Sequence, residues 1–133
     1  MLGPVRHIVM WRVSGETREE RAAARLKVKT AFEGLRGRIA GLTHVEVGID
    51  ISDVDYACDV VLVSEFATAA DLAAYASHPE HLRVRQELAD LRIARFQVDY
   101  VAGEAEPWAD ASRPSAAATD TALRPRGALI AGE

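Results

Sequence analysis

The chain has 133 residues, of which 49% are hydrophobic and 27% are charged, and its net charge is -4. This length and this apolar content fit a single domain with its own hydrophobic core. The slightly acidic balance does not favour nucleic acid or another strongly charged polymer as a partner.

The single cysteine, Cys58, forms no intramolecular disulfide and supports no cysteine-based zinc site. It lies in an apolar run, which favours a buried small side chain. Residues 1–13 are interrupted by Arg6 and His7, and they lack the charged start and long apolar stretch of a signal peptide. No apolar run approaches the ~18 residues that cross a bilayer. We therefore expect a soluble cytoplasmic protein without a membrane partner.

Residues 5–13 alternate in polarity, which predicts a strand. One face of that strand carries His7, Val9, Trp11 and Val13. Thr17, with Glu20 three residues later, forms a capping-box pattern, and a helix is expected to follow. The apolar stripe of this helix comprises Ala24, Val28, Ala31, Phe32, Leu35 and Ile39. We expect the helix to weaken at Gly37 and to end at Gly41.

Residues 42–50 alternate again, and residues 58–66 form the most β-prone stretch of the chain. Because the two stretches are close in sequence, they are expected to pair as a hairpin. The next helix is expected to start near Thr68 and Asp71, where a capping residue precedes the short segment DLAAYA.

The stretch YASHPEHLRV interrupts that helix. Either Ser77 caps a second helix with Glu80 as its reciprocal partner, or His78 is the cap and Pro79 takes the first helical position. The second helix is expected to turn Leu82, Leu88 and Ala89 inward. The last strand covers residues 92–101, and one of its faces carries Ala94, Phe96, Val98 and Tyr100.

The order strand, helix, strand, strand, helix, strand predicts an α+β, ferredoxin-like βαββαβ fold, an antiparallel four-stranded sheet with two helices on one face. We assign this domain to residues 1–101. Residues 102–133 are rich in Ala, Pro and Ser and have no sustained period, which favours a flexible tail. Within that tail, Trp108 and residues 128–131 are the parts that suit a contact with the domain.

The helix-free face of such a sheet normally meets water, yet residues 60–63 are apolar on both faces of their strand. Met10 and Trp11 likewise point to opposite faces. A sheet that is apolar on both faces needs a second cover, and the simplest is the same face of a second copy, related by a two-fold axis. The result is a dimeric α+β barrel. The alternative is a monomer with a modest exposed apolar patch.

Five segments together resemble the stress-responsive dimeric α/β-barrel (Dabb) family: RHIVMWRV, GLTHVEVGID, DVVLVSEF, LAAYASHPEHLRV and RFQVDY. The most specific is the His-Pro-x-His segment that follows a tyrosine. The resemblance covers residues 5–101 and implies a ferredoxin-like homodimer. It also implies a relation to polyketide cyclases of the olivetolic acid cyclase type, which close a poly-β-keto chain by intramolecular aldol condensation without a cofactor.

By this resemblance, a cavity between sheet and helices holds a small organic molecule, and His81 and Tyr75 are the catalytic candidates. A histidine with an ordinary pKa near ~6.5 supplies a neutral base, and a tyrosine hydroxyl donates to a developing enolate oxygen. The candidate substrate-binding residues are His7, Val9, Trp11 and His78. Arg83 and Arg85 follow on the same helix, where they either contact an acid group or lie in solvent.

Structural interpretations stay open beside these. Tyr75 and His81 also fit a core that contains hydrogen-bonded polar groups, and His78 fits a helix start before proline. A metal site of His7, His78 and His81 lacks zinc spacing, and none is predicted. The leading hypothesis is a homodimer that binds a small organic molecule, with its activity undefined. The alternatives are a cofactor-free cyclase or enolising enzyme, and a structural stress-associated dimer without a ligand.

Overall fold

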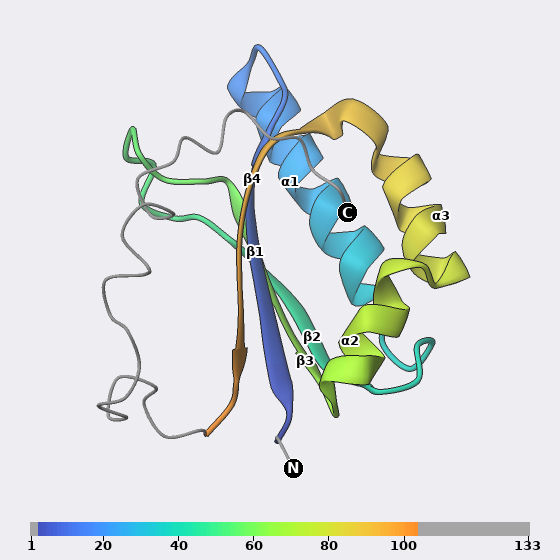
Figure 1. The fold of residues 1–133 in the computed structure, drawn as a ribbon. Coiled ribbons are helices and arrows are strands. Elements are labelled where there is room, and N and C mark those ends of the chain that lie inside the picture. Colours follow the sequence, from blue (N-terminus) through green and yellow to red (C-terminus); the bar gives the residue numbers. More distant parts are fainter. Residues whose placement is uncertain (1–2, 104–133) are drawn as a thin grey trace, which may run out of the picture.

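The computed structural model describes residues 3–103. The elements are β1 (Val5–Val13), α1 (Arg18–Glu33), β2 (Leu42–Ile49), β3 (Val60–Phe66), α2 (Ala69–Ala76), α3 (Pro79–Leu88), η1 (Ala89–Leu91) and β4 (Arg92–Val101). The strands form one antiparallel sheet in the order β2-β3-β1-β4. Helices α1, α2 and α3 lie on the same side of this sheet (Figure 1).

The ferredoxin-like fold predicted from the order of elements is thereby confirmed, with the second helix divided into α2 and α3. The tail predicted for residues 102–133, with Trp108 and residues 128–131, lies outside the described residues from position 104 onward.

The hydrophobic core lies between the sheet and the helices, and it follows the alternation of the strands. Every second residue of β1 from Val5 to Val13 is buried, so the predicted inward face, His7 included, is confirmed. Trp11 stacks on Phe32 of α1, with ring centroids 5.0 Å apart and planes inclined by 20°. The buried guanidinium of Arg92 lies 5.2 Å from the Trp11 ring centroid, which places a cation–π contact in the core.

Helix α1 begins as predicted but ends earlier than expected. Thr17 Oγ1 accepts a hydrogen bond from the Glu20 backbone N–H at 3.0 Å, as part of the capping box. The helix ends at Glu33 because Gly34, a poor helix former, is its C-cap. Gly41, with φ +85°, serves the later turn into β2, where an added Cβ would lie 2.7 Å from Asp71 Oδ1.

Helix α3 starts at Pro79, and His78 is its N-cap, so the second of the two alternatives for this junction is the correct one. His78 Nδ1 accepts a hydrogen bond from the Glu80 N–H at 3.0 Å. The buried residues of α3 are His81, Val84 and Leu88. The expectation that Leu82 and Ala89 face inward was wrong, because the stripe that begins at His81 continues at i+3 and i+7 and leaves both residues exposed.

The face of the sheet away from the helices carries apolar side chains, as the sequence predicts. The exposed large hydrophobic side chains on it include Met10 at 41%, Phe96 at 50%, Val98 at 54% and Tyr100 at 43%. The strand register places Phe96 beside Met10 and Val98 beside Ile8. Among residues 3–103 no helix covers this face (Figure 1). We refer to it below as the bare face.

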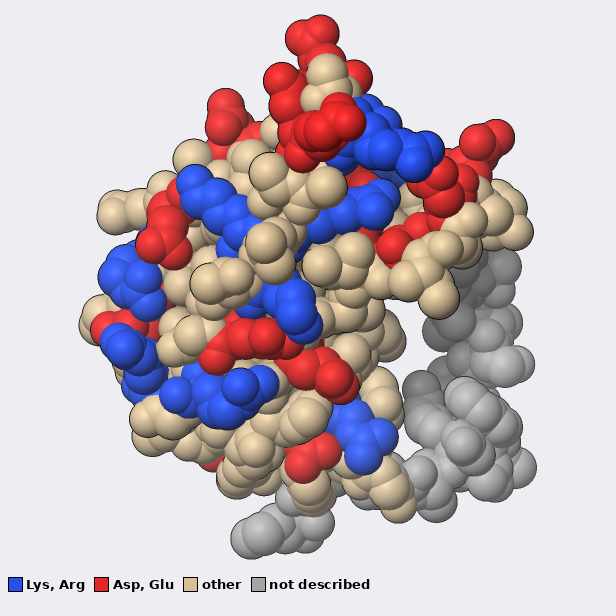
Figure 2. Space-filling view, turned by 180° about the vertical axis from the view of Figure 1, so that it is seen from behind, with Lys and Arg blue, Asp and Glu red and all other residues tan. Residues whose placement is uncertain are grey.

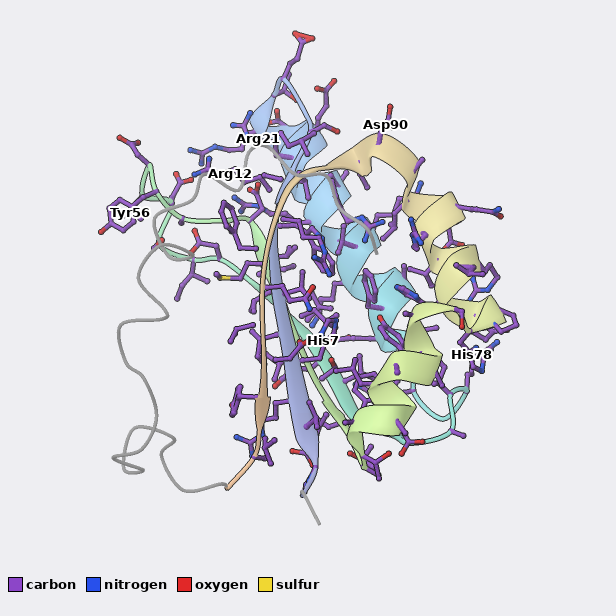
Figure 3. All side chains as sticks on the ribbon, viewed as in Figure 1. His7, Arg12, Arg21, Tyr56, His78 and Asp90 are labelled. Atoms are coloured by element: carbon purple, nitrogen blue, oxygen red, sulfur yellow. The ribbon has the colours of Figure 1, made fainter. Side chains whose placement is uncertain are left out.

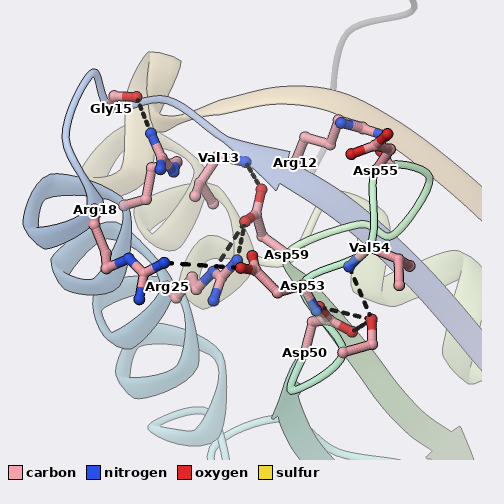
Figure 4. Close-up of polar contacts among 12 residues, drawn as sticks. Arg12, Val13, Gly15, Arg18, Arg25, Asp50, Asp53, Val54, Asp55 and Asp59 are labelled. Carbon is pink, nitrogen blue, oxygen red and sulfur yellow. Dashed lines mark hydrogen bonds and ion pairs between the residues drawn. The ribbon is translucent and has the colours of Figure 1, made fainter.

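Asp59 anchors the loop between β2 and β3 to the rest of the domain (Figure 4). Its Oδ1 accepts two hydrogen bonds from Arg25, at 2.9 and 2.7 Å, and its Oδ2 accepts one from the Val13 N–H at 2.8 Å. The two side chains are 22% and 14% exposed, so this ion pair is largely shielded from water. Next to Asp59, Cys58 is half-buried, and burial raises the pKa of its thiol.

The surface gives no sign of a basic binding face on the side seen in Figure 2. Lys and Arg side chains are interspersed there with Asp and Glu side chains (Figure 2). In residues 3–103, every helix is too short or too polar to cross a membrane.

Replacing Asp59 with alanine is expected to destabilise the fold by roughly 2 kcal/mol, because Arg25 and the Val13 N–H lose their acceptor in a shielded place. Urea unfolding measures the change. Asp55→Ala, in the same loop but exposed, is the matched control and is expected to change stability by less than about 0.5 kcal/mol. Equal losses in the two variants would show that the Asp59 contacts do not anchor the loop.

Glu33 should make stability depend on pH. Its Oε2 accepts hydrogen bonds from Lys29 Nζ at 2.7 Å and from the Val47 N–H at 3.0 Å, and these bonds lower the pKa of Glu33. A carboxyl whose pKa is lower in the folded state stabilises the fold above its unfolded pKa of ~4.3. That stabilisation is lost as the pH falls through the folded pKa.

Glu33→Gln is therefore expected to lower the free energy of unfolding by about 1 kcal/mol at neutral pH. At pH 3 the variant and the wild type should differ little, because the wild type loses the stabilisation by the Glu33 carboxylate as the pH falls. Chemical denaturation at a series of pH values measures the difference. Glu19→Gln, in the exposed first turn of α1, is the control. A constant gap between wild type and Glu33→Gln from pH 7 to pH 3 would contradict the assignment.

Candidate functional site

A cavity of about 360 Å³ opens between the helix-facing side of the sheet and the two short helices α2 and α3. It forms because α2 packs on β1 and β3, whereas the edge strand β4 is joined mainly to β1. The helices therefore do not cover the inner side of β4. The residues that line the cavity are His7, Leu72, Ala73, Tyr75, Ala76, His81, Arg85, Arg95, Gln97 and Asp99.

Tyr75 and His81 form one wall of this cavity, and their rings are stacked. The ring centroids are 4.1 Å apart and the planes are inclined by 27°. Tyr75 belongs to the last turn of α2 and His81 to the first turn of α3, and both side chains are buried. In one continuous helix, residues six apart lie about 120° away from a common stripe. The break at His78 and Pro79 removes that separation.

The proton on the His81 ring is positioned by the backbone. His81 Nδ1 lies 3.2 Å from the carbonyl oxygen of Ala76. A carbonyl oxygen only accepts hydrogen bonds, so Nδ1 is the donor in this contact. In the neutral ring, Nε2 is then the basic nitrogen. This is the tautomer that a general base at Nε2 requires.

His7 reaches the same cavity from β1, where it lies between the sheet and the helices (Figure 3). Its ring centroid is 5.9 Å from that of Tyr75, so the structure brings three predicted site residues together: His7, Tyr75 and His81. Its Nδ1 lies 2.6 Å from Oδ1 of Asp99 on β4. The contact joins residues that pair directly across β1 and β4, and it fixes the orientation of the buried imidazole.

Asp99 is one end of a polar row along the inner side of β4. Its Oδ2 accepts a hydrogen bond from Gln97 Nε2 at 2.9 Å. Gln97 Oε1 in turn accepts a hydrogen bond from the Arg95 guanidinium. The row Arg95, Gln97, Asp99 pairs with Trp11, Val9 and His7 on β1. It therefore faces the helices and the cavity.

The sequence reasoning did not identify Arg95, Gln97 or Asp99 as site residues. It recognised the apolar residues of β4 at alternate positions, and these lie on the bare face. The positions between these apolar residues could have indicated a site, because three consecutive inward-facing residues of a strand beneath helices are polar there. Polar residues at core-facing positions favour a cavity over close packing.

The two arginines of α3 lie in different places. Arg85 lines the cavity, whereas Arg83 forms ion pairs with Glu80 and Glu87 on the outer surface, at 3.1 and 3.6 Å. Of the two positions that the sequence offered for contact with an acid group, only Arg85 is suitably placed.

The other candidate residues lie away from this cavity. Val9 and Trp11 are fully buried in the core and are not among the residues that line it. His78 caps α3 on the outer side of the junction (Figure 3). The grouping of His7, His78 and His81 is therefore not formed. Among residues 3–103, no group of three or more His, Cys, Asp and Glu side chains is arranged to hold a metal ion.

The chemistry available in the cavity is acid–base chemistry and anion binding. One wall contains His81, whose tautomer the Ala76 carbonyl defines, and Tyr75, and α3 and β4 add Arg85 and Arg95. Leu72, Ala73 and Ala76 of α2 supply the apolar part of the lining.

Solved structures with the same fold include proteins without an assigned function. A dimeric ferredoxin-like protein of unknown function from Bacteroides fragilis is 32% identical, with a TM-score of 0.66 over 74% of this chain and 96% of that chain. A Dabb family protein from Mesorhizobium loti is 27% identical, with a TM-score of 0.58 over 77% of this chain and 99% of that chain.

A hydroxynitrile lyase from Passiflora edulis also matches, with 18% identity and a TM-score of 0.65 over 80% of this chain and 100% of that chain. At that identity the likeness shows the fold alone. Among curated proteins, none matches this chain. The model of the Stress responsive A/B Barrel Domain (Dabb) family matches residues 5–102. The chain belongs to this family.

Proposed function

We propose that this protein is a homodimer that binds a small organic molecule in the cavity between the sheet and helices α2 and α3. The observation that carries the proposal is the cavity itself, about 360 Å³ in volume and lined by His7, Tyr75 and His81. Its volume falls in the range of about 300–1,000 Å³ that is usual for small-molecule sites. Its lining combines apolar side chains with a few convergent polar groups, as such sites do.

The bare face supports the homodimer. Met10, Phe96, Val98 and Tyr100 leave an apolar surface that water would otherwise cover. At one end of this face, Arg6 donates hydrogen bonds to Glu65 and Tyr100, which supplies a polar rim. A similar protein, the one from Bacteroides fragilis, is described as dimeric. Two such faces packed against each other close the dimeric barrel expected from the sequence.

A second candidate function, a cofactor-free enolising or cyclase-like enzyme related to the polyketide cyclases, is favoured by the Tyr75–His81 stack. In this reaction His81 Nε2 removes a proton from carbon next to a carbonyl group. The Tyr75 hydroxyl donates a hydrogen bond to the enolate oxygen that forms. The enolate carbon then attacks a second carbonyl of the same chain, and the proton held by His81 returns to the new alkoxide. No electrons are exchanged with a cofactor in this sequence of steps.

A structural dimer without a ligand remains the third alternative, and binding separates it from the other two. A panel of small phenolic and β-keto acids is expected to raise the melting temperature of the wild type. His81→Ala is expected to weaken the binding roughly fivefold, since one hydrogen-bonding group of the wall is lost. Calorimetric titration measures the affinities.

His78→Asn is the matched control for this experiment. It changes the neighbouring histidine outside the cavity while keeping an N-cap acceptor for α3, so affinity should stay within about twofold. A wild type that no member of the panel stabilises would favour the structural alternative. Unchanged affinity in His81→Ala, together with a lack of turnover, would rule out the catalytic candidate.

Phe96→Asp is expected to convert the dimer into a monomer, because it places a charge among the apolar side chains of the bare face, beside Met10. Light scattering at micromolar concentration should give twice the 14.4 kDa chain mass for the wild type and a single chain mass for the variant. Leu26→Asp on the outer side of α1, where Leu26 is 57% exposed, is the control and should stay dimeric. A wild type that is monomeric in solution would contradict the proposed assembly.

A further inference from the structure

The lining of the cavity contains more positively charged side chains than negatively charged ones. Its lining contains the guanidinium groups of Arg85 and Arg95 but only one carboxylate, that of Asp99. With neutral histidines the lining therefore has a net charge of +1, although the whole chain has a net charge of -4. A positive cavity in an acidic protein attracts anions locally and is not a consequence of overall composition.

The single carboxylate of the lining is already occupied. Asp99 Oδ1 lies 2.6 Å from His7 Nδ1, and Asp99 Oδ2 accepts the hydrogen bond from Gln97. Both oxygens thus hold neighbouring side chains in place. Asp99 orients the imidazole of His7, and through Gln97 the same row orients Arg95.

Arg85 stands out among the basic residues of α3. Within residues 3–103 its side chain has no ion pair or hydrogen bond, whereas Arg83 on the same helix binds Glu80 and Glu87. Arg85 and Arg95 come from different walls, one from α3 and one from β4, and both border the same cavity. Two guanidinium groups that border one cavity provide the planar donors that carboxylates bind.

We propose that the molecule held in this cavity is a small organic acid with a single carboxylate. The carboxylate is bound by Arg85 and Arg95, and the carbonyl or hydroxyl end of the molecule lies against Tyr75 and His81. A carboxylate is favoured over a phosphate monoester because its single negative charge balances the net charge of +1 of the lining. This inference rests on the proposed binding function and names the class of ligand for the same site.

The test uses 4-hydroxybenzoate and its methyl ester, which differ in the charge of one group. Calorimetric titration with the full-length wild type should show that the acid binds roughly tenfold more tightly than the ester, and that this advantage shrinks as salt is added. Arg85→Gln and Arg95→Gln should each weaken the acid roughly tenfold and leave the ester nearly unchanged. Arg83→Gln, two residues from Arg85 but on the outer surface, should affect neither ligand.

The outcomes distinguish this inference from the proposed function beneath it. Equal affinity of acid and ester would overturn the carboxylate inference and leave small-molecule binding intact. An equal loss in Arg83→Gln and Arg85→Gln would also overturn it, because the effect would then reflect the general charge of α3. Tighter binding of phenyl phosphate than of the acid would point to a different anion. If neither 4-hydroxybenzoate nor its methyl ester binds, and the panel of small phenolic and β-keto acids fails as well, the proposed small-molecule binding is contradicted, and the carboxylate inference with it.

Discussion

The break between α2 and α3 is the constraint on which the candidate site depends. Pro79 has no N–H to continue α2, and His78 Nδ1 accepts the Glu80 N–H in its place, so a new helix begins in a new direction. Because of this change in direction, Tyr75 and His81 stack at 4.1 Å. The same junction brings the Ala76 carbonyl to His81 Nδ1 and so sets the tautomer of the ring. The N-cap of α3 and the stacking of Tyr75 on His81 therefore have the same local cause, the helix break at His78 and Pro79.

The edge strand β4 connects this site with the proposed dimer. Its inner side carries Arg95, Gln97 and Asp99, whereas its outer side carries Phe96, Val98 and Tyr100. This polarity is the reverse of that expected for a strand beneath helices, where the inner side is usually apolar. The reversal has a physical reason, since the helices leave the inner side of β4 open to the cavity. The outer side is apolar where a second copy is expected to cover it.

Most of the local features predicted from the sequence are present, but one helix end and the orientation of two side chains were predicted wrongly. The capping box at Thr17 and Glu20 and the strand alternation of β1 follow from neighbours in sequence, and both are present. The end of α1 was misplaced, because Gly34 already caps the helix, ahead of Gly37 and Gly41. On α3, Leu88 was predicted inward correctly, whereas the period of the helix turned Leu82 outward.

By itself, the sequence determined the order of elements, the fold class and an apolar bare face, because these follow from periodicity and caps. The family resemblance, carried chiefly by the His-Pro-x-His segment, added His7, Tyr75 and His81, which line the cavity. Only the tertiary structure decided which side chains complete the site. His7 and Asp99 are 92 positions apart, and they meet because β1 and β4 pair in a particular register. Arg85 of α3 and Arg95 of β4 border one cavity because the helices leave the inner side of this edge strand uncovered. Such proximities arise from strand register and helix placement, which local residue patterns do not specify.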